Sequence, residues 1–317
     1  MTGWIKFCAV RRGLSIFAIC AGAVVFCTPI LAQELFPLPA AGSSLFSDDS
    51  GSRRVASPED EREDAANREG EAAEGERDEI ETDRDSFTPA TTLVTPGRFI
   101  LESAYTFIDN RRVFETHSFP EAVLRYGVTD WFEARLQWNF EIGGAGDLVS
   151  TGAGDEEFFG GGVESESQIG YGFKLKVTEQ QGWIPESAFL ALGFTPTSGK
   201  EHASSFIGTY VWGWKMPNRW KLDAAFRYSA DSENGDGHNL WAPSVVLKVP
   251  LWERVNVHAE YFGIVSTGKE RNTSSHYFSP GLHYLVTNDF EVGFRLGWGL
   301  TDDAAKFFVN TGIGWRF

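Results

Sequence analysis

Short segments in which apolar and polar residues alternate fill the chain from residue 96 to residue 317, and this pattern constrains the fold most. In residues 131–142 one face carries only apolar side chains: Phe132, Ala134, Leu136, Trp138, Phe140 and Ile142. The other face carries polar and charged side chains: Glu133, Arg135, Gln137, Asn139 and Glu141. A period of two residues is typical of β-strands whose two faces meet different environments. We therefore predict an all-β fold for this part of the chain.

The length and composition of these segments distinguish a membrane barrel from a soluble sandwich. Several segments reach about ten residues or more, which is the span of a tilted strand across a bilayer and longer than a usual soluble strand. Large aromatic residues lie at the ends of the apolar faces, as in the girdles at the two membrane interfaces: Trp131, Trp212, Trp214, Trp220, Trp298 and Trp315. The sequence predicts a transmembrane antiparallel up-and-down β-barrel, in contact with the lipids of a Gram-negative outer membrane.

Twelve segments follow the pattern, and an even number returns both termini to one side of the membrane, as single-chain bacterial barrels require. We predict strands at residues 98–108, 116–127, 131–142, 165–177, 187–196, 204–216, 219–230, 239–249, 254–266, 275–286, 289–300 and 306–317. Tight connections alternate with longer ones, of which residues 143–163 form the longest. The short turns are expected to face the periplasm, and the long loops the exterior.

The last segment ends on an aromatic residue. Residues 306–317 alternate to the final position, with Trp315 and Phe317 on the apolar face. This ending resembles the carboxy-terminal signal by which outer-membrane barrels are recognised for insertion. We predict that Trp315 and Phe317 form a barrel-assembly signal, and that the barrel-assembly machinery is a partner.

The amino terminus reads as a secretory signal peptide over residues 1–32. Basic residues precede an apolar run from Leu14 to Cys27, and the segment finishes in Pro29-Ile30-Leu31-Ala32, after which cleavage is expected. An N-terminal membrane anchor is the alternative, but the run is shorter than the roughly 20 residues that a spanning helix needs. All three cysteines lie in this segment, so the mature chain would have no thiol, disulfide or thiolate metal site.

Residues 33–95 form an acidic segment that we predict to be disordered in the periplasm. Low hydrophobicity and net negative charge do not bury enough apolar surface to offset the entropy of ordering a chain. Much of the formal net charge of −16 lies here. Two roles stay open for the segment, which are plugging the pore and binding a periplasmic partner.

Two stretches carry a resemblance to a known family. Residues 95–102 (TPGRFILE) and 119–133 (FPEAVLRYGVTDWFE) resemble the outer-membrane family named for the MetA pathway of phenol degradation. The resemblance covers residues 96–317 and implies a small, transporter-like barrel that passes aromatic or other hydrophobic compounds. It supplies no catalytic residues, and the acidic segment is not part of the pattern.

Charged residues on the polar faces are the candidate pore-lining residues: Glu102, Glu121, Arg125, Glu133, Arg135, Glu141, Lys174, Arg227, Glu260, Glu291, Arg295 and Arg316. If a turn centres on residues 128–129, Arg125 and Glu133 lie opposite each other on adjacent strands and form an ion pair. Our hypothesis is a mixed-charge belt that narrows the channel or selects what passes. The alternative is structural pairing inside a wet lumen.

We predict a channel or transporter for small solutes rather than an enzyme. A phospholipase-like barrel enzyme is an alternative, but His202-Ala203-Ser204 has only the spacing of such a site, and an autotransporter-type translocator or structural barrel is another. Histidines at 258, 276 and 283 lie on separate strands without metal-ligand spacing. We expect no catalytic residue, cofactor or metal, and no nucleic-acid partner.

Overall fold

The computed structural model describes residues 79–84, 86–144, 164–199, 204–233, 236–268 and 271–317. The predicted signal peptide and residues 33–78 lie outside the described residues. Among the residues described, no helix is long and apolar enough to cross a membrane.

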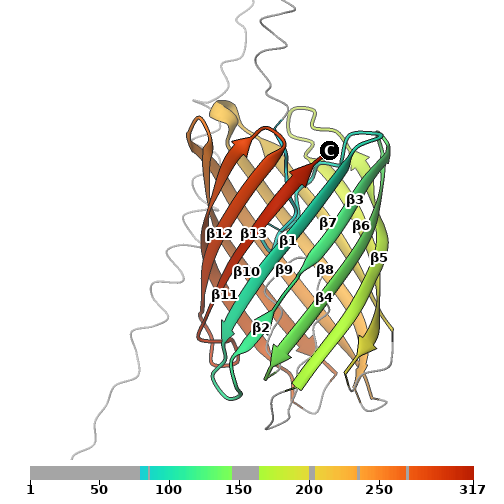
Figure 1. Cartoon of the computed structure of the whole chain (residues 1–317), viewed down its shortest axis with the longest axis vertical. Helices are drawn as coiled ribbons and strands as arrows, with labels where there is room; N and C mark the ends of the chain where they lie inside the picture. The colour runs from blue at the N-terminus through green and yellow to red at the C-terminus, as the bar shows by residue number, and fades with distance from the viewer. Residues whose placement is uncertain (1–78, 85, 145–163, 200–203, 234–235, 269–270) are drawn as a thin grey trace, which may run out of the picture. The chain divides into compact units, whose positions relative to one another are not determined.

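The described chain forms one closed antiparallel barrel of twelve strands, as predicted (Figure 1). The strands are β1 (Phe99–Asp109), β2 (Thr116–Ser118), β3 (Ala122–Thr129), β4 (Phe132–Gly143), β5 (Glu164–Thr178), β6 (Glu186–Ser198), β7 (Ser205–Lys215), β8 (Lys221–Glu233), β9 (Asp236–Trp252), β10 (Val255–Thr267), β11 (Ser274–Thr287), β12 (Phe290–Gly299) and β13 (Phe307–Arg316). β2 and β3 together occupy one strand position, since both pair with β1 on one side and β4 on the other, so the thirteen labelled segments make twelve strands. From β4 to β13 each strand pairs with the next in sequence, and β13 pairs with β1 to close the ring. Closure leaves no free sheet edge, which a membrane barrel requires.

Two details differ from the predicted strands. The second strand is interrupted at Phe119 and Pro120, because proline has no backbone N–H to donate, and its two parts are β2 and β3. Strands β8 and β9 run further than predicted, since their pairing continues to Glu233 opposite Asp236. The loop expected between residues 230 and 239 is therefore mostly strand.

The two ends of the barrel have different connections. One end, here called the short-turn end, carries residues 130–131, 179–185, 216–220, 253–254 and 288–289, together with Phe317. The opposite end, here called the long-loop end, carries residues 110–115 and 300–306; the connections from β4 to β5, β6 to β7, β8 to β9 and β10 to β11 lie partly or wholly outside the described residues. A short 3₁₀ turn, η1 (Pro217–Arg219), joins β7 to β8 at the short-turn end.

The outer surface is apolar and the inner surface polar, as the alternation predicts. On β4, Leu136, Trp138 and Ile142 point outward and are 49%, 44% and 42% exposed. The alternate residues Arg135, Gln137 and Asn139 point into the barrel and are buried. Lipid tails would cover the exposed apolar face, and side chains inside the barrel satisfy one another.

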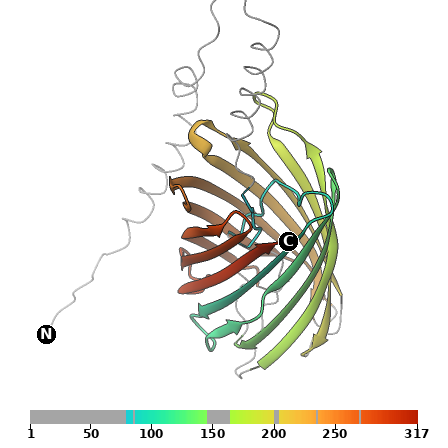
Figure 2. The ribbon, with the colours of Figure 1, turned by 45° about the horizontal axis from the view of Figure 1, so that its top comes forward.

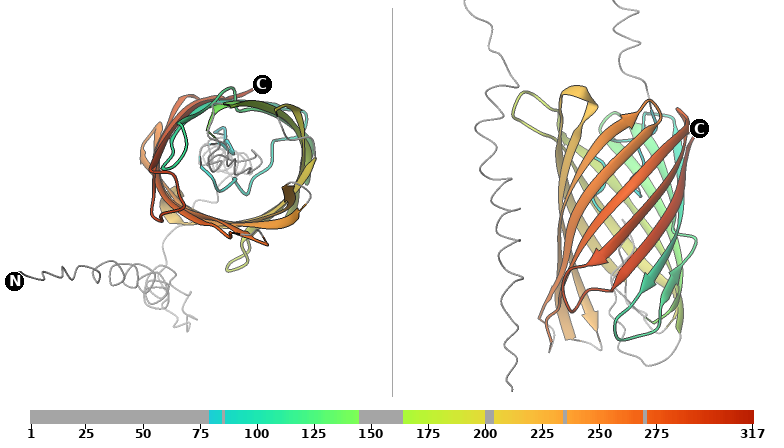
Figure 3. Two further views of the ribbon diagram at one scale, coloured as in Figure 1. Left: turned by 90° about the horizontal axis from the view of Figure 1, so that it is seen from below. Right: turned by 90° about the vertical axis from the view of Figure 1, so that its left-hand side faces the viewer.

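Residues 79–84 and 86–95 run inside the barrel, and we call residues 79–95 the plug (Figures 2 and 3); residue 85 lies outside the described residues. Seen along the barrel in Figure 3, the segment lies within the ring of strands. Most of it is buried, including Ile80, Asp83, Phe87 and Ala90. The prediction of disorder for residues 33–95 is therefore wrong for residues 79–95. The plug is ordered for two reasons. Its charged side chains and backbone N–H groups bind partners on the barrel wall, and residues 86–95 carry no charged side chain that would favour water.

Candidate functional site

The twelve predicted pore-lining residues all lie inside the barrel and are at most 7% exposed: Glu102, Glu121, Arg125, Glu133, Arg135, Glu141, Lys174, Arg227, Glu260, Glu291, Arg295 and Arg316. Several of them contact the plug and therefore do not line an open channel. Their role in passing a solute stays a prediction, as does the assembly role of Trp315 and Phe317.

A cluster of alternating charges surrounds Arg125. We call it the anchor cluster, and its members are Asp83, Arg84, Glu102, Glu121, Arg125, Glu133, Arg135 and Lys174. Arg125 Nε lies 2.9 Å from Glu133 Oε1, and its Nη1 lies 2.9 Å from Glu102 Oε1. The predicted pair of Arg125 and Glu133 is thus present, but it is diagonal, because an irregularity between Gly127 and Thr129 places Arg125 opposite Arg135.

The plug supplies two charges to the anchor cluster. Asp83 Oδ2 lies 2.7 Å from Arg135 Nη2, and Arg84 Nη1 lies 2.8 Å from Glu121 Oε2. Burial raises the pKa of the Asp83 carboxyl, but the surrounding cations, Arg125 first, lower that pKa by more, so it lies well below its ordinary value. The group is therefore ionised at neutral pH. Four carboxylates face four cations, so the cluster is balanced in charge.

Wall carboxylates also bind the backbone of the plug. Glu102 accepts hydrogen bonds from the backbone N–H groups of Asp83 and Arg84, at 3.1 and 3.0 Å. Glu133 accepts one from the N–H of Val94, at 2.9 Å. A hydrogen bond to a charged group contributes about 1.5–3 kcal/mol. The wall therefore holds the plug by its main chain as well as by its side chains.

A second attachment lies deeper in the lumen, around Glu260. Its carboxylate accepts hydrogen bonds from the N–H groups of Phe87 and Thr88, at 2.9 and 2.7 Å. The ring of Phe87 stacks on Phe262 with centroids 4.3 Å apart, and the guanidinium of Arg227 lies 4.3 Å from the Phe87 centroid. This attachment combines charge with aromatic packing.

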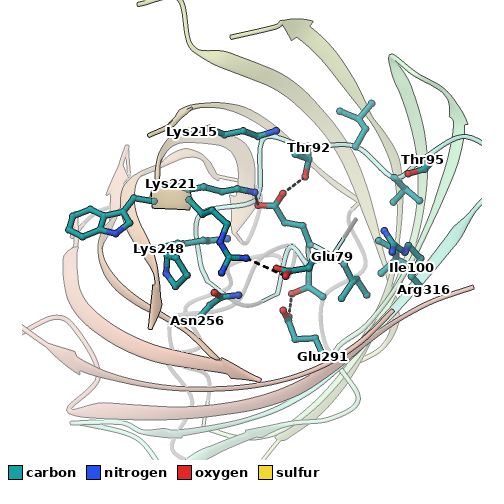
Figure 4. Close-up of a pocket in the computed structure, with 18 of the residues that line it drawn as sticks. Glu79, Thr92, Thr95, Ile100, Lys215, Lys221, Lys248, Asn256, Glu291 and Arg316 are labelled. Carbon is teal, nitrogen blue, oxygen red and sulfur yellow. Dashed lines mark hydrogen bonds and ion pairs between the residues drawn. The ribbon is translucent and has the colours of Figure 1, made fainter. Parts of the chain in front are cut away.

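A cavity of about 790 Å³ opens beside the plug at the short-turn end, and we call it the basic vestibule (Figure 4). Plug residues 79–82 and 92–95 form one side of it. The wall contributes five cations, which are Lys215, Arg219, Lys221, Lys248 and Arg316. Among the described residues, three carboxylates line the cavity, Glu79, Glu81 and Glu291, so the described part of its lining carries a positive excess.

Three of the lysines form a row across neighbouring strands. Lys215 on β7 is opposite Lys221 on β8, and Lys221 is opposite Lys248 on β9. Figure 4 shows all three on one side of the cavity. Like charges directly opposite each other destabilise a sheet, so the row needs anionic partners.

In the structure, glutamates of the plug are such anionic partners. Glu81 Oε1 lies 2.9 Å from Lys221 Nζ, and Thr92 donates its hydroxyl hydrogen to Glu81 Oε2 at 2.6 Å. Glu79 Oε1 lies 3.4 Å from Arg219 Nη1. Burial raises the pKa of Glu81, but Lys221 and then Lys248 lower that pKa by more, well below its ordinary value. Carboxylates are therefore held on the row as anions.

Plugging of the pore was one of two roles left open for residues 33–95, but residues 79–95 were not singled out from the sequence, and the lysine row was not among the predicted residues. The tight turn after Lys215 could have indicated the first pair of the row. It places Lys215 opposite Lys221 regardless of the register of the other strands. The third lysine follows from the register of β8 with β9: the predicted strand ends, residues 230 and 239, are paired in the structure, and the same register places Lys221 opposite Lys248.

The histidines that were considered for metal binding lie on strands β10 and β11. His258 and His283 lie on neighbouring strands with Nδ1 and Nε2 2.8 Å apart, and His276 lies elsewhere on β11, where it contacts Tyr261. Within the described ranges no three histidine, cysteine, aspartate or glutamate residues are arranged to hold a metal ion. Residues 202 and 203, part of the enzyme alternative, lie outside the described residues.

Comparisons with known proteins agree with this architecture. Residues 82–317 match the family described as "Putative MetA-pathway of phenol degradation", so the family pattern begins inside the plug rather than at residue 96. The fold is similar to the COG4313 outer membrane channel from Pseudomonas putida F1, with a TM-score of 0.52 and 12% identity over 75% of this chain and 100% of that one. The translocator domain of the autotransporter NalP from Neisseria meningitidis gives a TM-score of 0.43 at 12% identity, over 81% and 96% of the two chains. No curated protein matches the sequence.

Proposed function

Because the chain belongs to the family described as "Putative MetA-pathway of phenol degradation", we propose that it is an outer-membrane channel for small solutes, closed in the described state by its plug. The observation that carries the proposal is a closed barrel with an apolar exterior and a charged interior, in which residues 79–95 occupy the lumen. The short-turn end faces the periplasm. Aromatic or other hydrophobic compounds are the solutes that the family name suggests.

Conductance across a planar bilayer tests this proposal. The mature chain is compared with a variant that lacks residues 79–94, which leaves β1 and the rest of the barrel in place. We expect the deletion to raise conductance several-fold and to increase the flux of phenolic solutes into proteoliposomes, because the lumen of a twelve-stranded barrel is narrow and the plug fills part of it.

A variant that lacks residues 33–78 is the matched control, since it removes most of the acidic segment and keeps the plug. We expect its conductance to equal that of the mature chain. Absence of any conductance or flux in all three proteins would contradict the channel. Equal conductance in all three would show that the plug does not close it.

A further inference from the structure

The basic vestibule has a charge arrangement that the barrel alone does not require. Three lysines stand directly opposite one another at the mouth of the lumen, and Arg219 joins them from the adjacent turn. Repulsion within such a row costs stability. Lys215 Nζ lies 3.7 Å from Glu186 Oε2 within the wall, whereas the ion pair of Lys221 is with Glu81 of the plug. Polar uncharged residues would close these strand ends equally well, so Lys221 and its neighbour Lys248 are explained best by an anion that they bind.

The plug shows which kind of anion the row accepts. Carboxylate oxygens of Glu81 and Glu79 lie 2.9 and 3.4 Å from Lys221 and Arg219. These pairs are partly open to solvent, with Lys221 at 30% and Arg219 at 53% side-chain exposure. A carboxylate from solution can therefore reach the same cations and compete with the glutamates.

An apolar surface lies next to the row. Leu93 of the plug and Met216 and Pro250 of the wall line the same cavity, and Ile80, Val94 and Ile100 also border it, although they pack with Leu285 and are only 3–4% exposed. A cavity of about 790 Å³ is within the size range of small-molecule sites, which combine apolar walls with a few polar groups that orient the ligand. The vestibule thus offers cations on one side and an apolar wall on the other.

We propose that the basic vestibule binds a small solute that carries a carboxylate on an apolar body, with the carboxylate held by Lys221 and Lys248 in competition with Glu81. The inference rests on the proposed channel function and narrows its solutes to anions of this class. The site would collect the solute at the mouth of the lumen, beside the segment that closes the path.

Isothermal titration calorimetry of the detergent-solubilised mature protein tests the site, with benzoate as the probe. Benzyl alcohol has a similar size and shape without the charge. We expect saturable binding of benzoate and at least ten-fold weaker binding of benzyl alcohol, because the neutral alcohol forms no ion pair with the lysine ammonium groups. Equal binding of the two compounds, or no binding of benzoate, would overturn the proposal.

Substitutions locate the binding. Lys221→Gln with Lys248→Gln is expected to weaken benzoate binding about ten-fold or more, since two charge-assisted hydrogen bonds are lost. Glu81→Gln is expected to strengthen it about three-fold, because the competing carboxylate is gone while an amide oxygen can still accept the Thr92 hydrogen bond. Lys306→Gln, at the long-loop end and exposed, is the matched control and should leave binding unchanged. Equal loss in the control and the double variant would place the binding elsewhere and contradict the proposal.

Calorimetry needs no conduction, so the two proposals fail separately. Benzoate binding without conductance in any plug variant would contradict the channel alone. Conductance on plug deletion without benzoate binding would contradict the vestibule site alone.

Discussion

The anchor cluster and the basic vestibule both set plug carboxylates against wall cations, yet they differ in their access to water. Asp83 and Arg135 lie 2.7 Å apart with side chains 1% exposed, whereas Glu81 and Lys221 lie 2.9 Å apart with side chains 19% and 30% exposed. The two distances are nearly equal, so the difference is one of solvation. Breaking a buried pair costs about 3–5 kcal/mol, and an exposed pair contributes about 0–1 kcal/mol.

This difference in solvent access indicates different roles for the two sites. The anchor cluster is balanced in charge and sealed, so it determines whether the plug stays in the lumen. The vestibule has a cationic excess and is open, so its contacts exchange readily with solutes. A disturbance of the anchor cluster should therefore change closure, while the same chemical change in the vestibule should change binding.

The largest effect is expected from Asp83→Asn. The substitution keeps the shape of the side chain but leaves the cations around Arg135 and Lys174 with an unbalanced buried charge. We expect the docked plug to lose about 3 kcal/mol or more of stability. Conductance should rise, and trypsin should cleave after Arg84, which mass spectrometry of the released peptide would detect. If the variant keeps its low conductance and resists trypsin, the anchor cluster does not determine closure.

A smaller effect is expected from Phe87→Leu. Leucine keeps an apolar side chain but loses the stack on Phe262 and the cation–π contact with Arg227. We expect a loss of about 1–2 kcal/mol in plug docking. The same trypsin assay measures it, and cleavage should be slower than in the Asp83 variant. Faster cleavage would show that aromatic packing, rather than charge, dominates closure.

Lys221→Gln should have less effect on closure. Its pair with Glu81 is partly exposed, so the docked plug should change in stability by less than about 1 kcal/mol. Trypsin cleavage after Arg84 should be close to that of the unsubstituted protein. A change as large as that of the Asp83 variant would mean that the vestibule also determines closure.

A change of pH between 8 and 5 should have the smallest effect on closure. The pKa values of Asp83 and Glu81 are lowered in the docked plug, from ordinary values of 3.8 and 4.5. Lowered values stabilise docking above the ordinary pKa, and this contribution is lost only as the pH falls toward the docked values. Conductance should therefore be flat from pH 8 to pH 5. A rise within that interval would show that groups other than Asp83 and Glu81 determine closure.

The barrel was predictable because its strands obey one simple rule. Alternation fixes which side of β4 faces lipid, and the same rule placed Glu133 and Arg135 inside. The tight turns then determined which strands pair. The diagonal contact of Arg125 with Glu133 depended on an irregularity near Thr129, which alternation does not reveal.

The plug was not predictable by that rule. Residues 79–95 have no period of two or of 3.6, because their main chain bonds to side-chain carboxylates instead of to a neighbouring strand. Its partners Glu102, Glu133 and Glu260 are far apart in the sequence, and only the closed barrel brings them around one segment. The one local sign in the sequence was that the charged residues end at Asp85, so that residues 86–95 are uncharged.

The plug joins the barrel through a reversal at Gly97, where the backbone has a φ of 79° that glycine adopts without strain. The N–H of Arg98 bonds to the carbonyl of Thr95 at 3.1 Å, and β1 begins at once with Phe99. A segment tied this closely to the wall has an effective concentration on the order of millimolar at its own docking surface. Release would be followed by rapid recapture, so openings should be brief and repeated, and a single-channel trace should flicker rather than step to a lasting open level.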